Sequence, residues 1–169
     1  MQSMNELFHA LLQDVYYAEK QLLKALPKLA KKSANAQLSE AFLTHRDETE
    51  GQIERLDKVF EMIGKKPRAK KCDAILGIIA EGEEVIAEVE DRAVRDAGIL
   101  AAAQAAEHYE IARYGTLCAW AKALGHEDAV ELLQETLDEE KHADEVLKEI
   151  AESAVNEAAV EEVQDEAAE

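Results

Sequence analysis

The sequence predicts an all-α protein built as a four-helix bundle, in which one long connection carries a short fifth helix. Alanine, leucine, glutamate and lysine dominate the 169 residues, which include only seven glycines and two prolines. Such a composition is typical of long helices. Apolar residues also recur at the helical period almost throughout the chain. A five-helix bundle without a ligand site fits the same observations and stays open as an alternative.

Punctuating residues divide the chain into helices. The four long helices are expected at about residues 4–32, 36–63, 94–124 and 128–154, with the short fifth helix at about 74–89. Ser3 or Asn5 can cap the first helix, and Pro27 can kink that helix or end it early. Gly64 and Gly125 are suited to close the second and the third long helices. The short turns between the first pair and between the last pair predict two antiparallel hairpins.

The connection between the two hairpins is long. It begins with a strongly basic segment, residues 65–71, which we interpret as a solvated loop at a helix end. Asp73 is a candidate cap for the short helix that follows, which covers roughly 24 Å at about 1.5 Å per residue. This length suits a crossover that returns the chain to the other end of the bundle, as in ferritin-like folds.

The end of the chain differs in composition from the bundle. We expect residues 1–154 to form the ferritin-like helical bundle and residues 155–169 to form a separate tail. The tail holds six acidic and no basic side chains. Such a segment is predicted to be a frayed helix end or disordered.

The charge of the chain excludes several partners. With 37 acidic and 19 basic residues, the net charge is −18, which argues against nucleic acid and against anionic membranes. Two cysteines cannot form a disulfide framework, so we expect a cytoplasmic protein. No apolar run reaches the roughly 18 residues that a membrane-spanning helix needs. We interpret most of the acidic side chains as exposed groups that keep the protein soluble. A cation site would require carboxylates that face the interior.

Each long helix places a carboxylate on its apolar stripe. Glu19 lies between Val15 and Leu22 on the first helix. The other inward polar positions are His45, Glu48, Thr49 and Gln52 on the second helix, Glu107 with Glu110 at the stripe edge on the third, and Glu140 with Asp144 on the fourth. Clustered buried anions raise one another's pKa unless a cation lies between them. Divalent metals that prefer carboxylates supply such a cation.

The two hairpins also match each other, which predicts a site with approximate twofold symmetry. Dinuclear iron and manganese bundles use Glu-x-x-His on two of their helices, but Gly51 and Ala143 occupy the histidine positions here. A literal Glu-x-x-His occurs at Glu139 and His142. Helical periodicity favours a surface pair there, and a pair of metal ligands is the alternative.

At these residues the sequence resembles the YciE/YciF stress-protein family, over nearly the whole chain. The stretches that carry the resemblance are 14–23 around Glu19, 45–56 from His45 through Glu48 to Gln52, 107–115 from Glu107 through Glu110, and 136–144 with Glu140 and Asp144. The run Glu-His-Tyr-Glu-Ile-Ala, residues 107–112, is the most specific. A single helical glutamate is weak support, whereas this ordered set across four helices is strong.

The resemblance implies a ferritin-like bundle, a homodimer, a dinuclear iron-type centre and a role in bacterial stress. By resemblance, the main metal ligands are Glu19, Glu48, Glu107 and Glu140. Candidates to replace the missing histidines are Glu110, His45 and Asp144, while Gln52 is expected to contact a ligand rather than the metal.

Three functions fit these expectations. The first is a protein with two iron ions, or a mixed iron–manganese pair, that oxidises Fe²⁺ with O₂ or peroxide. The second is a structural or interaction dimer without catalysis, whose metal site is vestigial. The third is a storage cage, although the resemblance favours a dimer.

Overall fold

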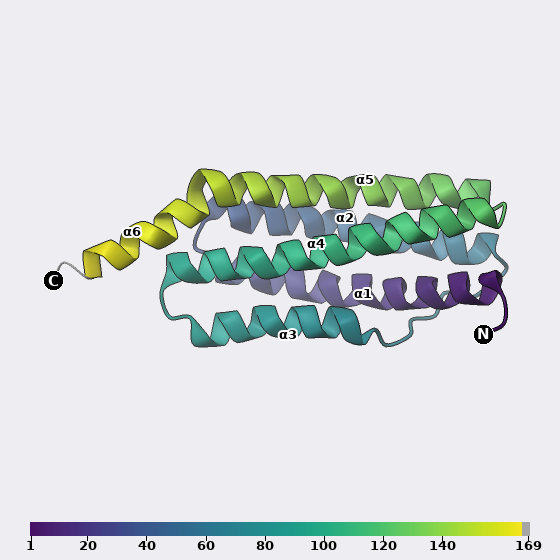
Figure 1. Ribbon diagram of the computed structural model, residues 1–169, viewed down its shortest axis with the longest axis horizontal. Helices are drawn as coiled ribbons and strands as arrows, with labels where there is room; N and C mark the ends of the chain where they lie inside the picture. Colours follow the sequence, from purple (N-terminus) through teal and green to yellow (C-terminus); the bar gives the residue numbers. More distant parts are fainter. Residues whose placement is uncertain (167–169) are drawn as a thin grey trace.

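All of the secondary structure that the computed structural model describes is helical (Figure 1). The structure describes residues 1–166, except for the side chains of residues 162–166. Its elements are α1 (Met4–Lys32), α2 (Ala36–Met62), α3 (Asp73–Glu88), α4 (Arg92–Ala123), α5 (Glu127–Ile150), the π-helical turn η1 (Ala151–Val155) and α6 (Asn156–Glu166). None of the described helices is long and apolar enough to cross a membrane.

The four long helices pack side by side as two antiparallel hairpins, α1 with α2 and α4 with α5 (Figure 1). The segment that follows α2 returns along the flank of α1, where the Lys70 amide donates to the Gln13 carbonyl at 3.0 Å. Helix α3 then continues along α1 and α4 and delivers the chain to the start of α4. The predicted four-helix bundle with a crossover helix is therefore confirmed.

Most of the predicted helix signals operate as expected. Ser3 caps α1 by accepting the amide of Glu6. Gly64 and Gly125 have positive φ angles of 68° and 76°, which glycine adopts without steric cost. Pro27 does not end α1, which continues to Lys32.

The start of the crossover helix differs from the prediction. Cys72 occupies the N-cap position of α3 and makes no side-chain capping bond. Asp73 instead lies in the first turn, where its carboxylate pairs with Lys71 at 2.8 Å. A carboxylate at this position is still stabilised by the positive end of the helix dipole.

The C-terminal segment is more ordered than a disordered tail. The chain passes from α5 through η1 into α6, which extends beyond the bundle (Figure 1). Val155 is buried and packs with Ile150 and Ala151 against the bundle, and the alanines and glutamates that follow favour helix. Residues 167–169 lie outside the described part, and the division into a bundle and a separate tail stays a prediction.

A polar layer lies between two apolar clusters of the four-helix interior, while a third and smaller cluster lies where α3 packs on α1 and α4. The first apolar cluster contains Phe8, Leu12, Val15, Leu56, Phe60, Tyr114, Leu117 and Leu133 among others. The second contains Leu26, Leu38, Phe42, Ile99, Leu100, Leu147 and Ile150 among others. Each long helix contributes to both clusters, and between them it presents the polar residues predicted from its stripe. The polar layer is thus held from both ends by close-packed side chains.

Candidate metal centre

Four side chains in the polar layer form the most compact group of possible metal ligands among the described residues. They are His45 from α2, Glu107 and Glu110 from α4, and Glu140 from α5. One ligand atom from each lies within 4.8 Å of the others. All four are buried, His45 being 6% and Glu140 0% exposed.

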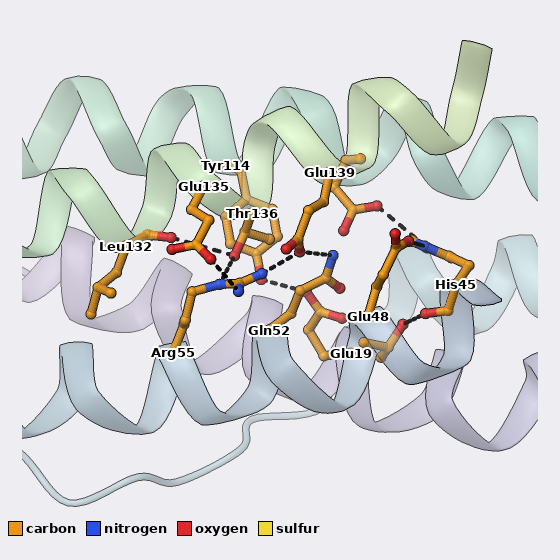
Figure 2. A network of polar contacts seen from close by, with 12 residues as sticks. Glu19, His45, Glu48, Gln52, Arg55, Tyr114, Leu132, Glu135, Thr136 and Glu139 are labelled. Atoms are coloured by element: carbon orange, nitrogen blue, oxygen red, sulfur yellow. Dashed lines mark hydrogen bonds and ion pairs between the residues drawn. The ribbon is translucent and has the colours of Figure 1, made fainter. Parts of the chain in front are cut away.

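Glu19 belongs to the same layer but is held differently. Its side chain is 0% exposed, and the buried hydroxyl of Tyr114 donates a hydrogen bond to its Oε1 (Figure 2). Its pKa is raised by burial and by the charge of Glu140. Glu19 therefore shares the electrostatic environment of the four-residue group, with one oxygen directed by a tyrosine.

Glu48 lies at the edge of the layer. Its side chain is 31% exposed, and its Oε2 lies 3.1 Å from His45 Nδ1 (Figure 2). The other imidazole nitrogen, Nε2, lies 3.4 Å from Glu107 and 3.5 Å from Glu140. His45 thus bridges the exposed carboxylate to two buried ones. The negative charge of each carboxylate favours the protonated form of the His45 imidazole. A metal ion bound to this histidine would take the place of that proton.

Asp144 lies farther out than the sequence suggested. Its side chain is 21% exposed. It accepts a hydrogen bond from Gln104 at 3.3 Å and pairs with His108 Nε2 at 3.2 Å. Its charge still raises the pKa of Glu107, so it lies near the centre, although it is outside the compact group.

The electrostatics of the layer show a strong excess of acid. Burial, followed by neighbouring carboxylates, raises the pKa of Glu19 and of Glu107 to about 8. Burial also raises the pKa of Glu110 and of Glu140 well above the ordinary value. Burial alone would lower the pKa of His45, but Glu48 and Glu140 outweigh it and raise that pKa. Without a cation these carboxyl groups keep their protons near neutral pH.

The unpartnered oxygens of the layer fit a divalent metal. Most buried polar atoms in proteins have a hydrogen-bond partner. Within the described residues, seven atoms of the layer have none: Glu19 Oε2, Gln52 Oε1, Glu107 Oε2, both carboxylate oxygens of Glu110 and both of Glu140. Carboxylate oxygens with one imidazole nitrogen form a donor set for a divalent metal. The residues present could therefore hold a metal ion.

A separate polar network closes one side of the layer (Figure 2). Arg55 on α2 donates to Thr136 Oγ1 at 2.9 Å, to Glu135 at 3.0 Å and to Glu139. Gln52 Nε2 donates to the same Glu139 carboxylate at 3.1 Å. The literal Glu-x-x-His pair is not assembled as ligands, because Glu139 bonds to Arg55 and Gln52 while His142 is exposed.

Two of these contacts were not predicted from the sequence. Nothing in the sequence distinguishes Tyr114 from the other tyrosines, and only its complete burial shows that its hydroxyl needs a partner. Arg55 lies seven residues after Glu48 and three after Gln52, a helical spacing that could have placed it beside the site.

Together, the crossover topology and the buried carboxylate layer define a class: ferritin-like helical bundles with a carboxylate-rich candidate metal centre. The chain belongs to the family described as "Domain of unknown function (DUF892)", which matches residues 3–160.

Similar proteins have the same architecture. The chain is 50% identical over 157 residues to protein YciF of Escherichia coli K12, covering 92% of this chain and 95% of YciF. The crystal structure of that protein, called a stress protein, is similar with a TM-score of 0.89 over 92% of this chain and 99% of the other. YcfI of Rhodopseudomonas palustris, for which a structural role has been suggested, is 51% identical with a TM-score of 0.86, over 87% and 94% of the two chains. The resemblance to the YciF stress proteins is therefore confirmed.

Proposed function

We propose that this protein binds a dinuclear iron-type centre, of two iron ions or mixed iron and manganese, and oxidises Fe²⁺ with O₂ or peroxide. The observation that carries the proposal is the cluster of buried carboxylates, of which six oxygens have no hydrogen-bond partner among the described residues. The proposed main ligands are Glu19, Glu48, Glu107 and Glu140, supplemented by Glu110, His45 and Asp144. A natural protein rarely keeps such a cluster without a compensating cation.

The protein residues have distinct roles in this proposal. Tyr114 fixes one oxygen of Glu19, which leaves the other oxygen available to a metal. His45 is oriented by Glu48 through Nδ1, as ligand histidines commonly are by a neighbouring carboxylate. The apolar clusters on either side pack against the layer and hold its side chains in place. When bound, the metal pair supplies electron transfer between Fe²⁺ and the oxidant.

The setting of this activity is part of the same proposal. The similarity to a stress protein supports a role in bacterial stress. The net charge of −18 supports a protein that binds neither nucleic acid nor anionic membranes. We propose a cytoplasmic homodimer, and light scattering combined with size-exclusion chromatography measures the oligomeric state.

Anaerobic reconstitution tests the proposal. Metal-free protein is incubated with Fe²⁺ under nitrogen, bound iron is counted, and O₂ or hydrogen peroxide is then added. We expect two irons per chain and rapid conversion to Fe³⁺. Glu140→Ala should lose bound iron and activity, whereas the control Glu131→Ala, at an exposed position on the same helix, should lose neither. Wild-type protein without bound iron would refute the proposal.

A structural or interaction dimer with a vestigial site is the second candidate, favoured by the structural role suggested for YcfI. It predicts protein purified without metal, no change in unfolding temperature on adding a chelator, and a Glu48→Ala variant at least as stable as the wild type. Loss of stability on chelation supports the metal centre instead.

A further inference from the structure

A cleft between α2 and α5 leads from the surface to the carboxylate layer. Its volume is about 420 Å³, within the range of roughly 300–1,000 Å³ that small-molecule sites occupy. The inner end is formed by His45 and Glu107, and the walls include Phe42, Val146 and Leu147. The cleft therefore joins a mostly apolar chamber to the proposed reactive centre.

Small residues keep this cleft open. Ala143 lies on its wall, three residues after Glu140, where a Glu-x-x-His motif would place an imidazole. Ala41 lies on the wall formed by α2. The corresponding position of the other hairpin, Gly51, is instead approached by the Arg55 guanidinium, which would lie 3.9 Å from an added Cβ. Of the two positions where the motif would place a histidine, Gly51 thus has the Arg55 guanidinium beside it, whereas Ala143 faces the cleft.

One buried atom at the inner end points to a ligand. Glu107 is 3% exposed, lines the cleft, and its Oε2 has no hydrogen-bond partner within the described residues. Its nearest basic group, His45 Nε2, lies 3.4 Å away. A polar end group that enters the cleft would meet this carboxylate and the imidazole.

The size and charge of the cleft restrict the molecule that fits. A volume of about 420 Å³ is many times the roughly 30 Å³ of a water molecule, so O₂ or hydrogen peroxide alone would leave most of it unfilled. Apolar walls favour a carbon body. Glu40 and Glu48 also line the cleft and repel an anionic ligand. The occupant that fits is small and not anionic, with a polar end and an apolar body.

We propose that the cleft binds a neutral organic hydroperoxide, whose carbon body packs between α2 and α5 and whose O–O bond reaches the carboxylate layer. This proposal rests on the proposed Fe²⁺ oxidation and names its oxidant. The O–O bond breaks and takes up two electrons from two Fe²⁺ ions and two protons from solvent. One alcohol, one water molecule and two Fe³⁺ ions result. The apolar walls retain the carbon body while the inner end receives the two oxygens.

Binding is tested without metal. Cumyl alcohol, the unreactive alcohol that corresponds to cumene hydroperoxide, is titrated into metal-free protein and followed by amide NMR. We expect saturable shifts confined to the cleft residues of α2 and α5 and to Glu107 with its neighbours on α4. Ala143→Phe should fill the cleft and abolish the shifts, and Ala41→Leu should weaken them from the opposite wall. Ala105→Phe, at an exposed position on α4, is the matched control and should bind normally.

Oxidant choice is tested in iron-loaded protein. Ala143→Phe should slow Fe²⁺ oxidation by cumene hydroperoxide about tenfold, because small steric changes in apolar pockets have effects of this size. Oxidation by hydrogen peroxide, a much smaller molecule, should be slowed less than oxidation by cumene hydroperoxide, with both rates expressed per bound iron. Ala105→Phe should behave as the wild type with both oxidants.

The outcomes separate the two proposals. Absent or unsaturable cumyl alcohol shifts overturn the cleft proposal even if the protein binds and oxidises iron. Equal slowing of both peroxides by Ala143→Phe also overturns it. If Ala143→Phe dissociates a dimer and cumyl alcohol does not bind, the cleft belongs to a second copy of the chain. Protein that binds cumyl alcohol but no iron overturns the proposed function and its hydroperoxide reaction, while the small-molecule site remains.

Discussion

The apolar clusters and the polar layer occupy the same four helices at similar burial, yet their chemistry is opposite. The first cluster is stabilised by packing of apolar side chains alone, among them Leu12, Leu56, Leu117 and Leu133. Glu110 and Glu140 in the layer are buried as deeply, but within the described part of the chain their carboxylate oxygens lack hydrogen-bond partners. The clusters stabilise the fold, whereas the layer reduces stability unless something binds there.

This contrast indicates why burial of charge is informative in a helical bundle. Replacing the layer by leucine would continue a seamless core, because the residues before and after it on each helix are already apolar. The layer, unlike the clusters, offers buried oxygen atoms to a ligand, so substitutions in the two regions should have different effects.

The largest effect on stability is expected in an apolar cluster. Leu133→Ala should lower the free energy of unfolding by about 2–5 kcal/mol, because it leaves a cavity in a fully buried site. Iron stoichiometry should be unchanged, since Leu133 lies in the first cluster. Denaturant unfolding and metal analysis measure the two quantities. A variant of unchanged stability would show that this cluster is not the main support of the bundle.

A substitution in the layer should have the opposite sign. Glu110→Leu should raise the stability of metal-free protein by about 1–3 kcal/mol, because a buried polar group without a partner is removed. It should also weaken iron binding. Glu131→Leu, at an exposed position, is the control and should change neither quantity appreciably. Destabilisation by Glu110→Leu would mean that the carboxylate supports the fold directly.

Tyr114 connects the two regions. Its ring packs in the first cluster, and its hydroxyl donates a hydrogen bond to Glu19 in the layer. Tyr114→Phe should destabilise the metal-free protein by about 1 kcal/mol, the usual contribution of one hydrogen bond. It should also raise the pKa of Glu19, because that hydrogen bond lowers it. Carboxyl NMR titration reads the shift directly. An unchanged titration would show that the tyrosine does not direct Glu19.

The smallest effect is expected outside both regions. Lys28 and Glu83 pair at 3.6 Å while both side chains are largely exposed. Lys28→Ala should change the free energy of unfolding by less than about 1 kcal/mol, as exposed ion pairs generally do. Thermal unfolding at low and high salt checks this, and a larger loss would mean that the crossover helix is fastened mainly by charge.

The sequence predicted the fold well because the apolar periodicity of the long helices is continuous except at the polar layer. The same periodicity identified Glu19, Glu107 and Glu140 as inward-facing, and the structure buries all three. Positions near the edge of a stripe were harder, because their burial depends on how neighbouring helices cross. Glu110 was placed at an edge and is buried, whereas Glu48 and Asp144 were placed on the stripe and are partly exposed.

Contacts between helices were beyond reach from one sequence. The bond from Tyr114 to Glu19 and that from Arg55 to Glu139 each join residues far apart in the chain. Periodicity gives the face of a residue but not the partner opposite it. The cleft has the same origin, since it depends on small residues of two helices meeting across a gap.

The most direct test of the metal centre is thermal unfolding with and without Fe²⁺ between pH 4.5 and 8, under nitrogen. In that window the native Glu19 and Glu107, whose pKa is raised to about 8, hold protons that the unfolded chain has released. Metal-free protein should therefore lose stability as pH rises, and Glu110→Leu should lessen this loss.

Metal binding requires deprotonated ligands, so the stabilisation by Fe²⁺ should grow over the same pH range. The account predicts unfolding temperatures that diverge with rising pH, the iron-loaded protein being the more stable. Curves that coincide with and without Fe²⁺ at every pH would contradict it.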